Sequence, residues 1–535
     1  MTRTEHGLAP RTGVITTNRP LTQKAASGVA WITSFQIARQ LLQVVSLSIL
    51  ARRIPPGVYG LVGMAALVTN LLETVRDVGT GTALVREREM PNELASTGFW
   101  VNCITGVAVT LFLVLLSGPA AHFFHQPQLA TILRFLAISF FLGALSVVPM
   151  ALLSRAMEFR KLAFAQTLGA ICATAVAIGM ALAGGKVAAL VAANLVASFA
   201  TSIAVWILSP LRVMAVFRVA DARRILSFGL NLTGSHLLNY FSRNADNVLV
   251  GRFLGSTPLG YYQMAYTLMA YPLQNFGMTV YQVVYPALSN FSDDHERLRA
   301  AYLRTSRLIA LITFPAMLGL AVTAQPFVRL FLGPKWLPVA GLLLVFAPLG
   351  ALQTLCDPIS LIYSTQGRMD VLFRWQILAS VSYVLSFVVG LRWGIFGVAT
   401  SYAIVWTVLM FPSLAIPFRL VGLPLKTFFG SLWPMIWYSL VMAAVAGAWL
   451  YGLGRVGIQN AAVEFATTAA VGAALYTALV LWRRPPVLSE LSMVLGGSSY
   501  RGIRAAARFI SSDTRRTEEL DSREATSSQE VPKIN

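Results

Sequence analysis

Hydrophobic stretches of membrane-spanning length recur along almost the whole chain. A helix needs about 20 consecutive, mostly apolar residues to cross the hydrocarbon core of a bilayer. Fourteen stretches fit that requirement, and short polar segments separate them. The predicted helices occupy residues 29–51, 59–85, 97–117, 130–153, 163–183, 187–208, 227–250, 259–286, 308–331, 338–363, 372–391, 394–417, 430–451 and 462–482. The pattern predicts an all-α polytopic membrane protein with about 14 transmembrane helices.

The composition supports lipid as the solvent of this chain. Hydrophobic residues make up 56% of its 535 residues and charged residues only 12%, against about 25% charged residues in a soluble domain. The three cysteines, Cys103, Cys172 and Cys356, lie far apart inside apolar stretches. Their spacing fits neither a metal site nor a disulfide framework. We therefore expect no metal site and no cofactor.

The distribution of basic residues predicts the orientation. If the N-terminus is cytoplasmic, 30 of the 42 Lys and Arg residues fall in cytoplasmic segments, seven on the other side and five within helices. Cytoplasmic loops carry an excess of Lys and Arg. Both termini are thus predicted to be cytoplasmic, and the net charge of +20 follows from topology. We expect no nucleic-acid partner.

The chain contains an internal repeat. A shift of 200 residues places Arg52 on Arg252, Gly60 on Gly260 and Met64 on Met264. An even number of helices in each repeat makes the two halves run in the same direction. The predicted parts are a cytoplasmic arm (1–28), an N-terminal six-helix bundle (29–208), a pseudosymmetric C-terminal six-helix bundle (227–417), an extra helix pair (430–482) and a partly disordered cytoplasmic tail (483–535).

Polar residues follow one face of the first and the seventh predicted helix. Spacings of three and four residues keep them on that face. They are Gln36, Arg39, Gln43 and Ser46 on the first helix and His236, Asn239, Arg243 and Asp246 on the seventh. The 200-residue shift maps one stripe onto the other, so we expect both to line a central cavity.

Ionisable groups inside a bilayer are costly and indicate function. The guanidinium fork matches phosphate oxygens, so Arg39 and Arg243 are candidates to bind a diphosphate, with Gln36, Gln43, His236 and Asn239 completing the substrate site. The carboxylates Glu73, Asp77 and Asp246 are candidates to couple transport to H⁺ or Na⁺. An alternative remains open, in which these groups pair internally, for example Arg243 with Asp246, and lock the bundle.

Four sequence stretches resemble the polysaccharide exporters, the lipid-linked oligosaccharide flippases of the multidrug/oligosaccharidyl-lipid/polysaccharide (MOP) superfamily. They are Ala51–Met64 (ARRIPPGVYGLVGM), Arg76–Val85 (RDVGTGTALV), Phe228–Gly255 and Leu332–Trp336 (LGPKW). The resemblance covers about residues 25–425. It implies two six-helix bundles around a cavity that opens alternately to each side of the bacterial inner membrane.

The resemblance also implies a function. The cargo would be an oligosaccharide on undecaprenyl diphosphate, for exopolysaccharide, capsule or O-antigen synthesis. Membrane lipids surround such a protein, and a polysaccharide polymerase and glycosyltransferases are its expected partners. No catalytic residue is expected, because such a chain is a transporter and not an enzyme.

Three rival functions differ in their requirements. A MATE-type drug or cation antiporter of the same superfamily needs carboxylates without central arginines, which Arg39 and Arg243 argue against. A membrane-bound polymerase or ligase needs a large outer loop with catalytic groups, whereas every predicted outer loop here is short. A lipid II flippase is a closer rival, since fourteen helices fit it equally well.

Overall fold

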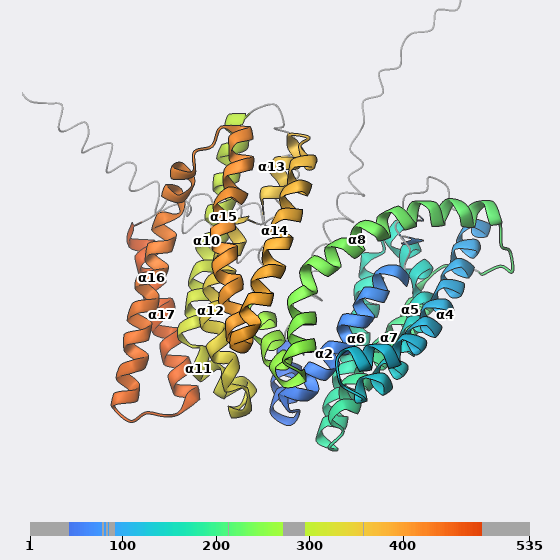
Figure 1. Cartoon of the computed structure of the whole chain (residues 1–535), viewed down its shortest axis with the longest axis horizontal. Coiled ribbons are helices and arrows are strands. Elements are labelled where there is room, and N and C mark those ends of the chain that lie inside the picture. Colours follow the sequence, from blue (N-terminus) through green and yellow to red (C-terminus); the bar gives the residue numbers. More distant parts are fainter. Residues whose placement is uncertain are drawn as a thin grey trace, which may run out of the picture. The chain divides into compact units, whose positions relative to one another are not determined.

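The computed structural model describes residues 42–76, 80–81, 84, 91–211, 213–270, 295–356 and 358–483. These residues form helices joined by short connections and contain no β-strand. Each of the fourteen predicted segments coincides with helical residues, which is consistent with the expected number of helices. The structure thus confirms the all-α class (Figure 1).

Twelve long helices make up most of the described residues. They are α2 (Pro56–Arg76), α4 (Asn92–Phe123), α5 (Gln128–Arg155), α6 (Phe159–Leu182), α7 (Lys186–Leu208), α8 (Val219–Phe253), α10 (His295–Val322), α12 (Leu337–Cys356), α14 (Met369–Gly390), α15 (Gly394–Val421), α16 (Leu425–Arg455) and α17 (Ala461–Arg483). Residues 42–53 and 256–270 are also helical. Short helices at Ala324–Phe327 (α11), Val328–Leu332 (η1, a π-helix), Pro334–Trp336 (η2), Ile359–Thr365 (α13) and Leu391–Trp393 (η3) connect longer ones.

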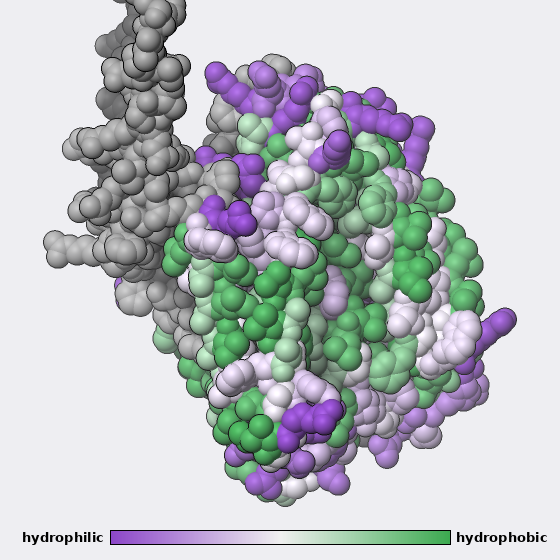
Figure 2. Space-filling view, turned by 90° about the vertical axis from the view of Figure 1, so that its left-hand side faces the viewer, coloured by the Kyte–Doolittle hydropathy of each residue, from purple (hydrophilic) through white to green (hydrophobic). Residues whose placement is uncertain are grey.

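The surface of these helices is apolar. Nine segments of the described residues are long and hydrophobic enough to cross a membrane, and one of them, Met369–Val421, holds both α14 and α15. Figure 2 shows a hydrophobic band between hydrophilic ends on the face that carries α16 and α17. Such a band matches the hydrocarbon core of a bilayer, so the chain is a multi-pass membrane protein.

Several helices extend beyond their predicted ends. Helix α8 begins at Val219 rather than at residue 227, and α10 begins at His295 rather than at residue 308. Arg and Glu favour helix formation, and the backbone can stay helical after it leaves the hydrocarbon. Hydrophobicity marks only the part of a helix that lies in the hydrocarbon. The prediction therefore missed the polar first turns of α8 and α10. In contrast, the predicted segment 338–363 is divided, because α12 ends at Cys356 and α13 follows Pro358.

The chain divides into two compact units. The first unit comprises Met1–Leu47, Thr69–Ser117 and Thr131–Leu237. In it, α6 packs along α7, and two side chains of α7 bond to α5. The Ser202 hydroxyl lies 2.6 Å from that of Ser146, and the Trp206 Nε1–H donates to the Leu145 carbonyl at 3.0 Å. These polar contacts satisfy groups that lipid cannot.

The second unit comprises Ser48–Val68, Gly118–Ala130 and Leu238–Asn535. Helix α10 packs against α12 and α16 in this unit. An aromatic cluster of Tyr302, Phe418 and Phe428 joins α10, α15 and α16, with ring centroids 5.0 to 5.9 Å apart. The Tyr476 hydroxyl of α17 donates to the Leu311 carbonyl of α10 at 2.8 Å. The extra helices α16 and α17 are therefore packed onto this unit.

Candidate functional site

Asp246 of α8 is a buried carboxylate in the second unit, with only 6% of its surface exposed. The Tyr262 hydroxyl donates a hydrogen bond to its Oδ2 at 3.0 Å. Its Oδ1 accepts from the backbone N–H of Asn247 at 2.7 Å and from the Asn247 Nδ2 at 3.1 Å. The Asn247 Oδ1 is buried and has no hydrogen-bond partner within the described structure. A carboxylate and a free amide oxygen are thus buried side by side.

The wall around Asp246 is aromatic. The Tyr262 ring packs edge-on against Phe346 of α12 at 5.2 Å between centroids. Farther along α12, the Gln353 Nε2 donates to the Tyr402 hydroxyl of α15 at 3.1 Å. A charge in such surroundings is costly unless it is paired. The site is therefore suited to hold a proton or a small cation on the Asp246 carboxylate.

Arg243 lies one helical turn before Asp246 and is exposed. Asp246 takes its hydrogen bonds from Asn247 and Tyr262, and Arg243 is not among its described partners. The internal pairing of Arg243 with Asp246 is thus not the arrangement found. A charged side chain on a membrane-spanning helix is stable only where it meets water or another polar group. An exposed Arg243 therefore favours a wet surface along this side of α8.

The other predicted site residues are described to different extents. Gln43 is exposed on the helical residues 42–53 and makes a polar contact, and Glu73 is exposed on α2. His236 and Asn239 belong to α8, but their side chains lie outside the described structure, as do Gln36, Arg39 and Asp77 altogether. The predicted facing of the two polar stripes stays a prediction.

Sequence reasoning missed Asn247, Tyr262, Gln353 and Tyr402. Asn247 adjoins Asp246, which is a signal that could have been used. The others lie on separate helices at no regular spacing, and the 200-residue shift maps Tyr262 onto Val62. Only tertiary packing brings them together.

A crossing of equivalent repeat positions lies in the same unit. Helix α2 and the helical residues 256–270 meet so closely at Gly60 and Gly260 that neither position has room for a side chain. A Cβ atom on Gly60 would lie 2.8 Å from the Gly260 nitrogen, and one on Gly260 would lie 3.1 Å from the Gly60 nitrogen. One helical turn to either side, a Cβ atom on Gly57 or Gly63 would instead meet the side chains of Thr257 and Gln263. We call this contact the glycine crossing.

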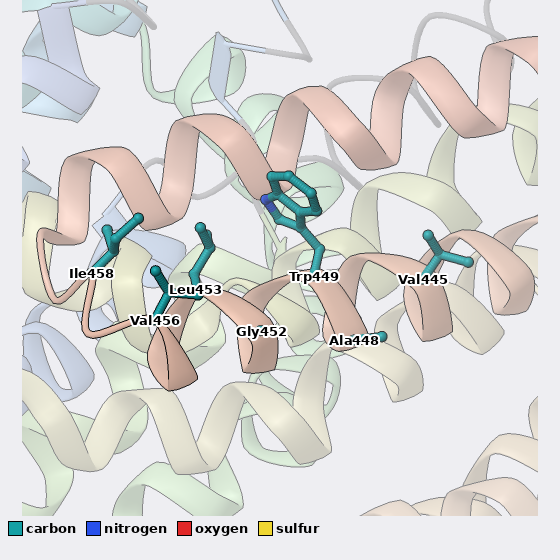
Figure 3. A pocket seen from close by; sticks show the side chains of 7 residues that line it. All are labelled: Val445, Ala448, Trp449, Gly452, Leu453, Val456 and Ile458. Carbon is teal, nitrogen blue, oxygen red and sulfur yellow. The ribbon is translucent and has the colours of Figure 1, made fainter.

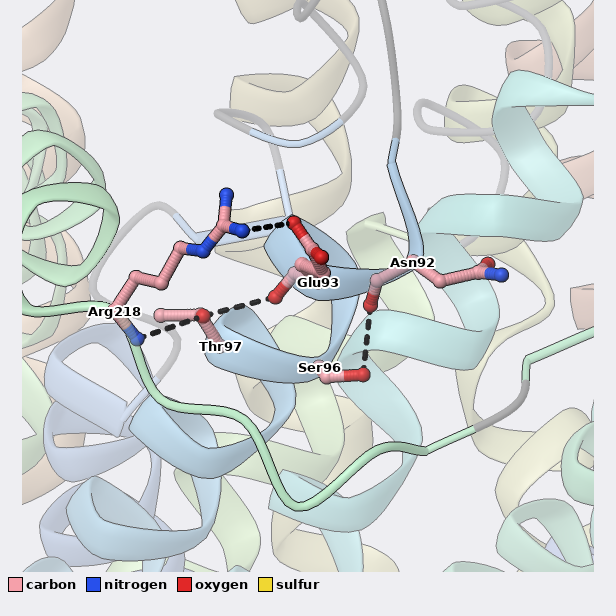
Figure 4. Close-up of polar contacts among 5 residues, drawn as sticks. All are labelled: Asn92, Glu93, Ser96, Thr97 and Arg218. Atoms are coloured by element: carbon pink, nitrogen blue, oxygen red, sulfur yellow. Dashed lines mark hydrogen bonds and ion pairs between the residues drawn. The ribbon is translucent and has the colours of Figure 1, made fainter.

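The connection between α7 and α8 is attached to α4 in the first unit (Figure 4). The backbone N–H of Met214 donates to the Ser96 hydroxyl at 3.0 Å, and that of Arg218 donates to the Thr97 hydroxyl at 3.2 Å. The Arg218 guanidinium also pairs with Glu93. The segment that links the two repeats is therefore held by its backbone.

An apolar groove of about 510 Å³ lies along the C-terminal end of α16 and the turn that follows it (Figure 3). Its lining consists only of apolar residues, which are Val445, Ala448, Trp449, Gly452, Leu453, Val456 and Ile458. It offers no charged group to a polar headgroup. It differs in this from the surroundings of Arg243 and Asp246.

The fold defines a multi-pass helical membrane protein, and its helix α8 carries the ionisable residues Arg243 and Asp246. The polysaccharide biosynthesis protein family matches residues 49–341, more than half of the chain, and the chain belongs to that family.

Relatives match over most of their length. The lipopolysaccharide biosynthesis protein WzxC of Escherichia coli strain K12 is 26% identical over 82% of this chain and 89% of its own. The teichuronic acid biosynthesis protein TuaB of Bacillus subtilis strain 168 is 26% identical over 88% and 98%. The succinoglycan biosynthesis transport protein ExoT of Rhizobium meliloti strain 1021 is 26% identical over 86% and 94%.

Solved structures share the fold. The lipid II flippase MurJ in an inward closed conformation matches 85% of this chain and 98% of its own, with a TM-score of 0.70 and 16% identity. An inward-facing multidrug resistance MATE family transporter of the MOP superfamily matches 72% and 94%, with a TM-score of 0.57 and 16% identity. The TM-scores establish a common fold. The sequence identities are too low to indicate a common cargo.

Proposed function

We propose that this chain is a flippase that moves oligosaccharide repeat units on undecaprenyl diphosphate across the bacterial inner membrane by alternating access. The observation that carries the proposal is the set of relatives that match nearly end to end. Their names assign them to lipopolysaccharide, teichuronic acid and succinoglycan synthesis, the last as a transport protein. The product would be an exopolysaccharide, a capsule or an O-antigen.

The proposed orientation has both termini in the cytoplasm. It rests on the excess of Lys and Arg in alternate loops. The ends of the helices near Arg52, His125 and Arg252 then face the outer side, where a polymerase would receive the cargo. Glycosyltransferases would supply it on the cytoplasmic side. The chain itself would act as a carrier without a catalytic residue.

Arg243 is proposed to bind the diphosphate together with Arg39. The exposure of Arg243 on α8 supports this role, since its guanidinium is available to an anion. Two parallel N–H···O bonds to a phosphate are stronger than bonds between neutral groups. Gln36, Gln43, His236 and Asn239 would add polar contacts along the same two stripes.

Asp246 is proposed to couple transport to H⁺ or Na⁺. Its burial, together with the unpartnered Asn247 Oδ1 beside it, supports cation or proton binding. Glu73, exposed on α2, and Asp77 remain further coupling candidates. The ion would bind and neutralise the Asp246 carboxylate in one conformation of the transport cycle and dissociate in the other. Ion binding would then shift the equilibrium between the two conformations.

The rival functions have weaker support. MurJ and the MATE transporter resemble this chain in fold at 16% identity, whereas the relatives of higher identity belong to polysaccharide synthesis. An exposed arginine on α8 suits an anionic headgroup better than a cationic drug. We therefore rank the lipid II flippase and the drug antiporter below the polysaccharide flippase.

Restoration of polymer export tests the proposal. In a strain that lacks its own copy of this protein, the wild-type chain should restore export, and Arg243→Ala should reduce it roughly ten-fold or more through a lost charge-assisted bond. Arg223→Ala is the matched control, because Arg223 is an exposed arginine near the polar start of α8. Equal export from both variants at equal membrane levels would contradict the role of Arg243.

A further inference from the structure

One arginine inside a span of the first unit has no part in the proposed function. Arg134 lies on α5 and is exposed, although α5 is long and hydrophobic enough to cross a membrane. Its Nε–H donates a hydrogen bond to the hydroxyl of Ser117 on α4 at 3.2 Å. Both residues belong to the same compact unit. The contact is therefore a local feature of the α4–α5 pair.

The hydroxyl that receives this bond is itself fixed. Ser117 has no exposed surface, and its hydroxyl donates to the carbonyl of Val114 at 2.7 Å. Because the proton of Ser117 goes to Val114, its oxygen is left to accept from Arg134. A guanidinium has five N–H donors, and the bond to Ser117 uses only the Nε–H. The two Nη groups of Arg134 can thus serve another acceptor.

The surface around Arg134 is apolar. Ile138 and Phe141 follow it on the same face of α5 and are 49% and 37% exposed. On α4, Val114 lies one turn before Ser117 and is 38% exposed. Such a surface is suited to hydrocarbon. Among the residues that the structure describes, Arg134 has no ion-pair partner, and a guanidinium beside lipid needs water or an anion.

The depth of Arg134 decides which anion can reach it. Arg134 lies six residues after Gln128, where α5 begins, and Ser117 lies six residues before Phe123, where α4 ends. At 1.5 Å per residue, the pair is about 9 Å from the turn between the helices. A headgroup layer is about 5 to 7 Å thick, so the long side chain can reach lipid phosphates. Thr131, exposed one turn nearer the turn, adds a hydroxyl.

We propose that Arg134, fixed by Ser117, binds the phosphate group of a membrane lipid, with Thr131 as a further donor. The fork of guanidinium donors matches two phosphate oxygens, and the lipid chains would lie against the apolar side chains beside it. A phospholipid and a polyprenyl phosphate carrier share this phosphate chemistry. Under the proposed orientation the site lies toward the outer side of the membrane, but its geometry depends on α4 and α5 alone.

Quenching by brominated lipids tests the site in the purified full chain. Cys103, Cys172 and Cys356 are first replaced by Ala, and a fluorophore is attached at Ile138→Cys, one turn from Arg134. The vesicles contain phosphatidylglycerol and phosphatidylcholine, with bromine on the chains of one lipid or of the other. The ratio of the two quenching efficiencies gives the local preference for phosphatidylglycerol. We expect a preference of about five-fold, because one basic residue attracts an anionic lipid by roughly this factor.

Variants separate the charge of Arg134 from its packing. Arg134→Gln should lower the preference to about one, whereas Arg134→Lys should keep most of it. Ser117→Ala retains the charge and should give an intermediate value. A fluorophore at Val381→Cys on α14, which is exposed in the other unit, is the control and should show no preference. A ratio of one in the wild type, or equal ratios in the wild type and Arg134→Gln, would overturn the site.

Competition identifies the source of the phosphate. Unbrominated undecaprenyl phosphate or unbrominated phosphatidylglycerol is added to the vesicles that contain brominated phosphatidylglycerol. Recovery of fluorescence at a lower mole fraction of undecaprenyl phosphate assigns the site to the carrier lipid, and recovery at equal mole fractions assigns it to phospholipids. No transported cargo is needed in these measurements, so failure of the lipid site is distinguishable from failure of the flippase assignment.

Discussion

At the scale of single residues, the environment of each charged group decides what it can do. Arg243 and Asp246 lie one turn apart on α8, yet Arg243 is exposed whereas Asp246 is buried and bonded to Asn247 and Tyr262. The exposed guanidinium can meet an anionic ligand. The buried carboxylate can take only a partner small enough to enter its aromatic surroundings.

Asp246→Asn tests the coupling role. The amide oxygen of Asn can accept from Tyr262 or from Asn247 but not from both, so some stability should be lost together with the ionisable group. Transport driven by an ion gradient should fall roughly ten-fold, and the remaining transport should no longer depend on the H⁺ or Na⁺ gradient. Asp221→Asn, in the first turn of α8, should behave like the wild type. Unchanged gradient dependence in Asp246→Asn would rule out this carboxylate as the coupling group.

At the scale of elements, close approach of backbones determines which helices can cross. Lipid does not drive helices together as water does, so small residues that allow backbone contact set the interface. Gly60 and Gly260 provide such a contact between α2 and residues 256–270. The 200-residue repeat aligned these two glycines in the sequence, but nothing in the alignment indicated that they touch.

Gly60→Ala should push the crossing apart. The added methyl would overlap the Ser256 carbonyl oxygen, which belongs to rigid helix backbone. The melting temperature of the purified chain should therefore fall. Gly430→Ala in α16 is the control, because a methyl there meets nothing within 4 Å, and it should keep or raise the stability by about 0.5 to 1 kcal/mol. Equal behaviour of the two variants would contradict the tight crossing.

The hydrogen bonds between α4 and the connection from α7 to α8 lead to a second prediction. Ser96→Ala leaves the Met214 N–H without its acceptor, which should lower the unfolding free energy by about 1 to 3 kcal/mol. Arg218→Gln removes only an exposed ion pair with Glu93 and should cost less than about 1 kcal/mol. Thermal unfolding of the purified variants compares them, and a reversed order would contradict this attachment.

At the scale of the whole molecule, the sequence predicted the helical class because membrane-spanning runs are long and continuous. It predicted helix ends less well, since the charged first turns of α8 and α10 lie outside the hydrophobic pattern. It singled out Arg243 and Asp246 from their cost in lipid. It missed Tyr262, Gln353 and Tyr402, because contacts between helices that are distant in the sequence produce no regular spacing of residues.

Reconstituted transport tests the central claim most directly. The purified chain in liposomes should move an undecaprenyl-diphosphate-linked oligosaccharide from one leaflet to the other, as measured by its exposure to a membrane-impermeant glycosidase. The account predicts exposure well above that of protein-free liposomes, reduced roughly ten-fold or more by Arg243→Ala and unaffected by Arg223→Ala. Exposure equal to that of protein-free liposomes, from a chain that is folded and correctly inserted, would contradict the assignment as a flippase.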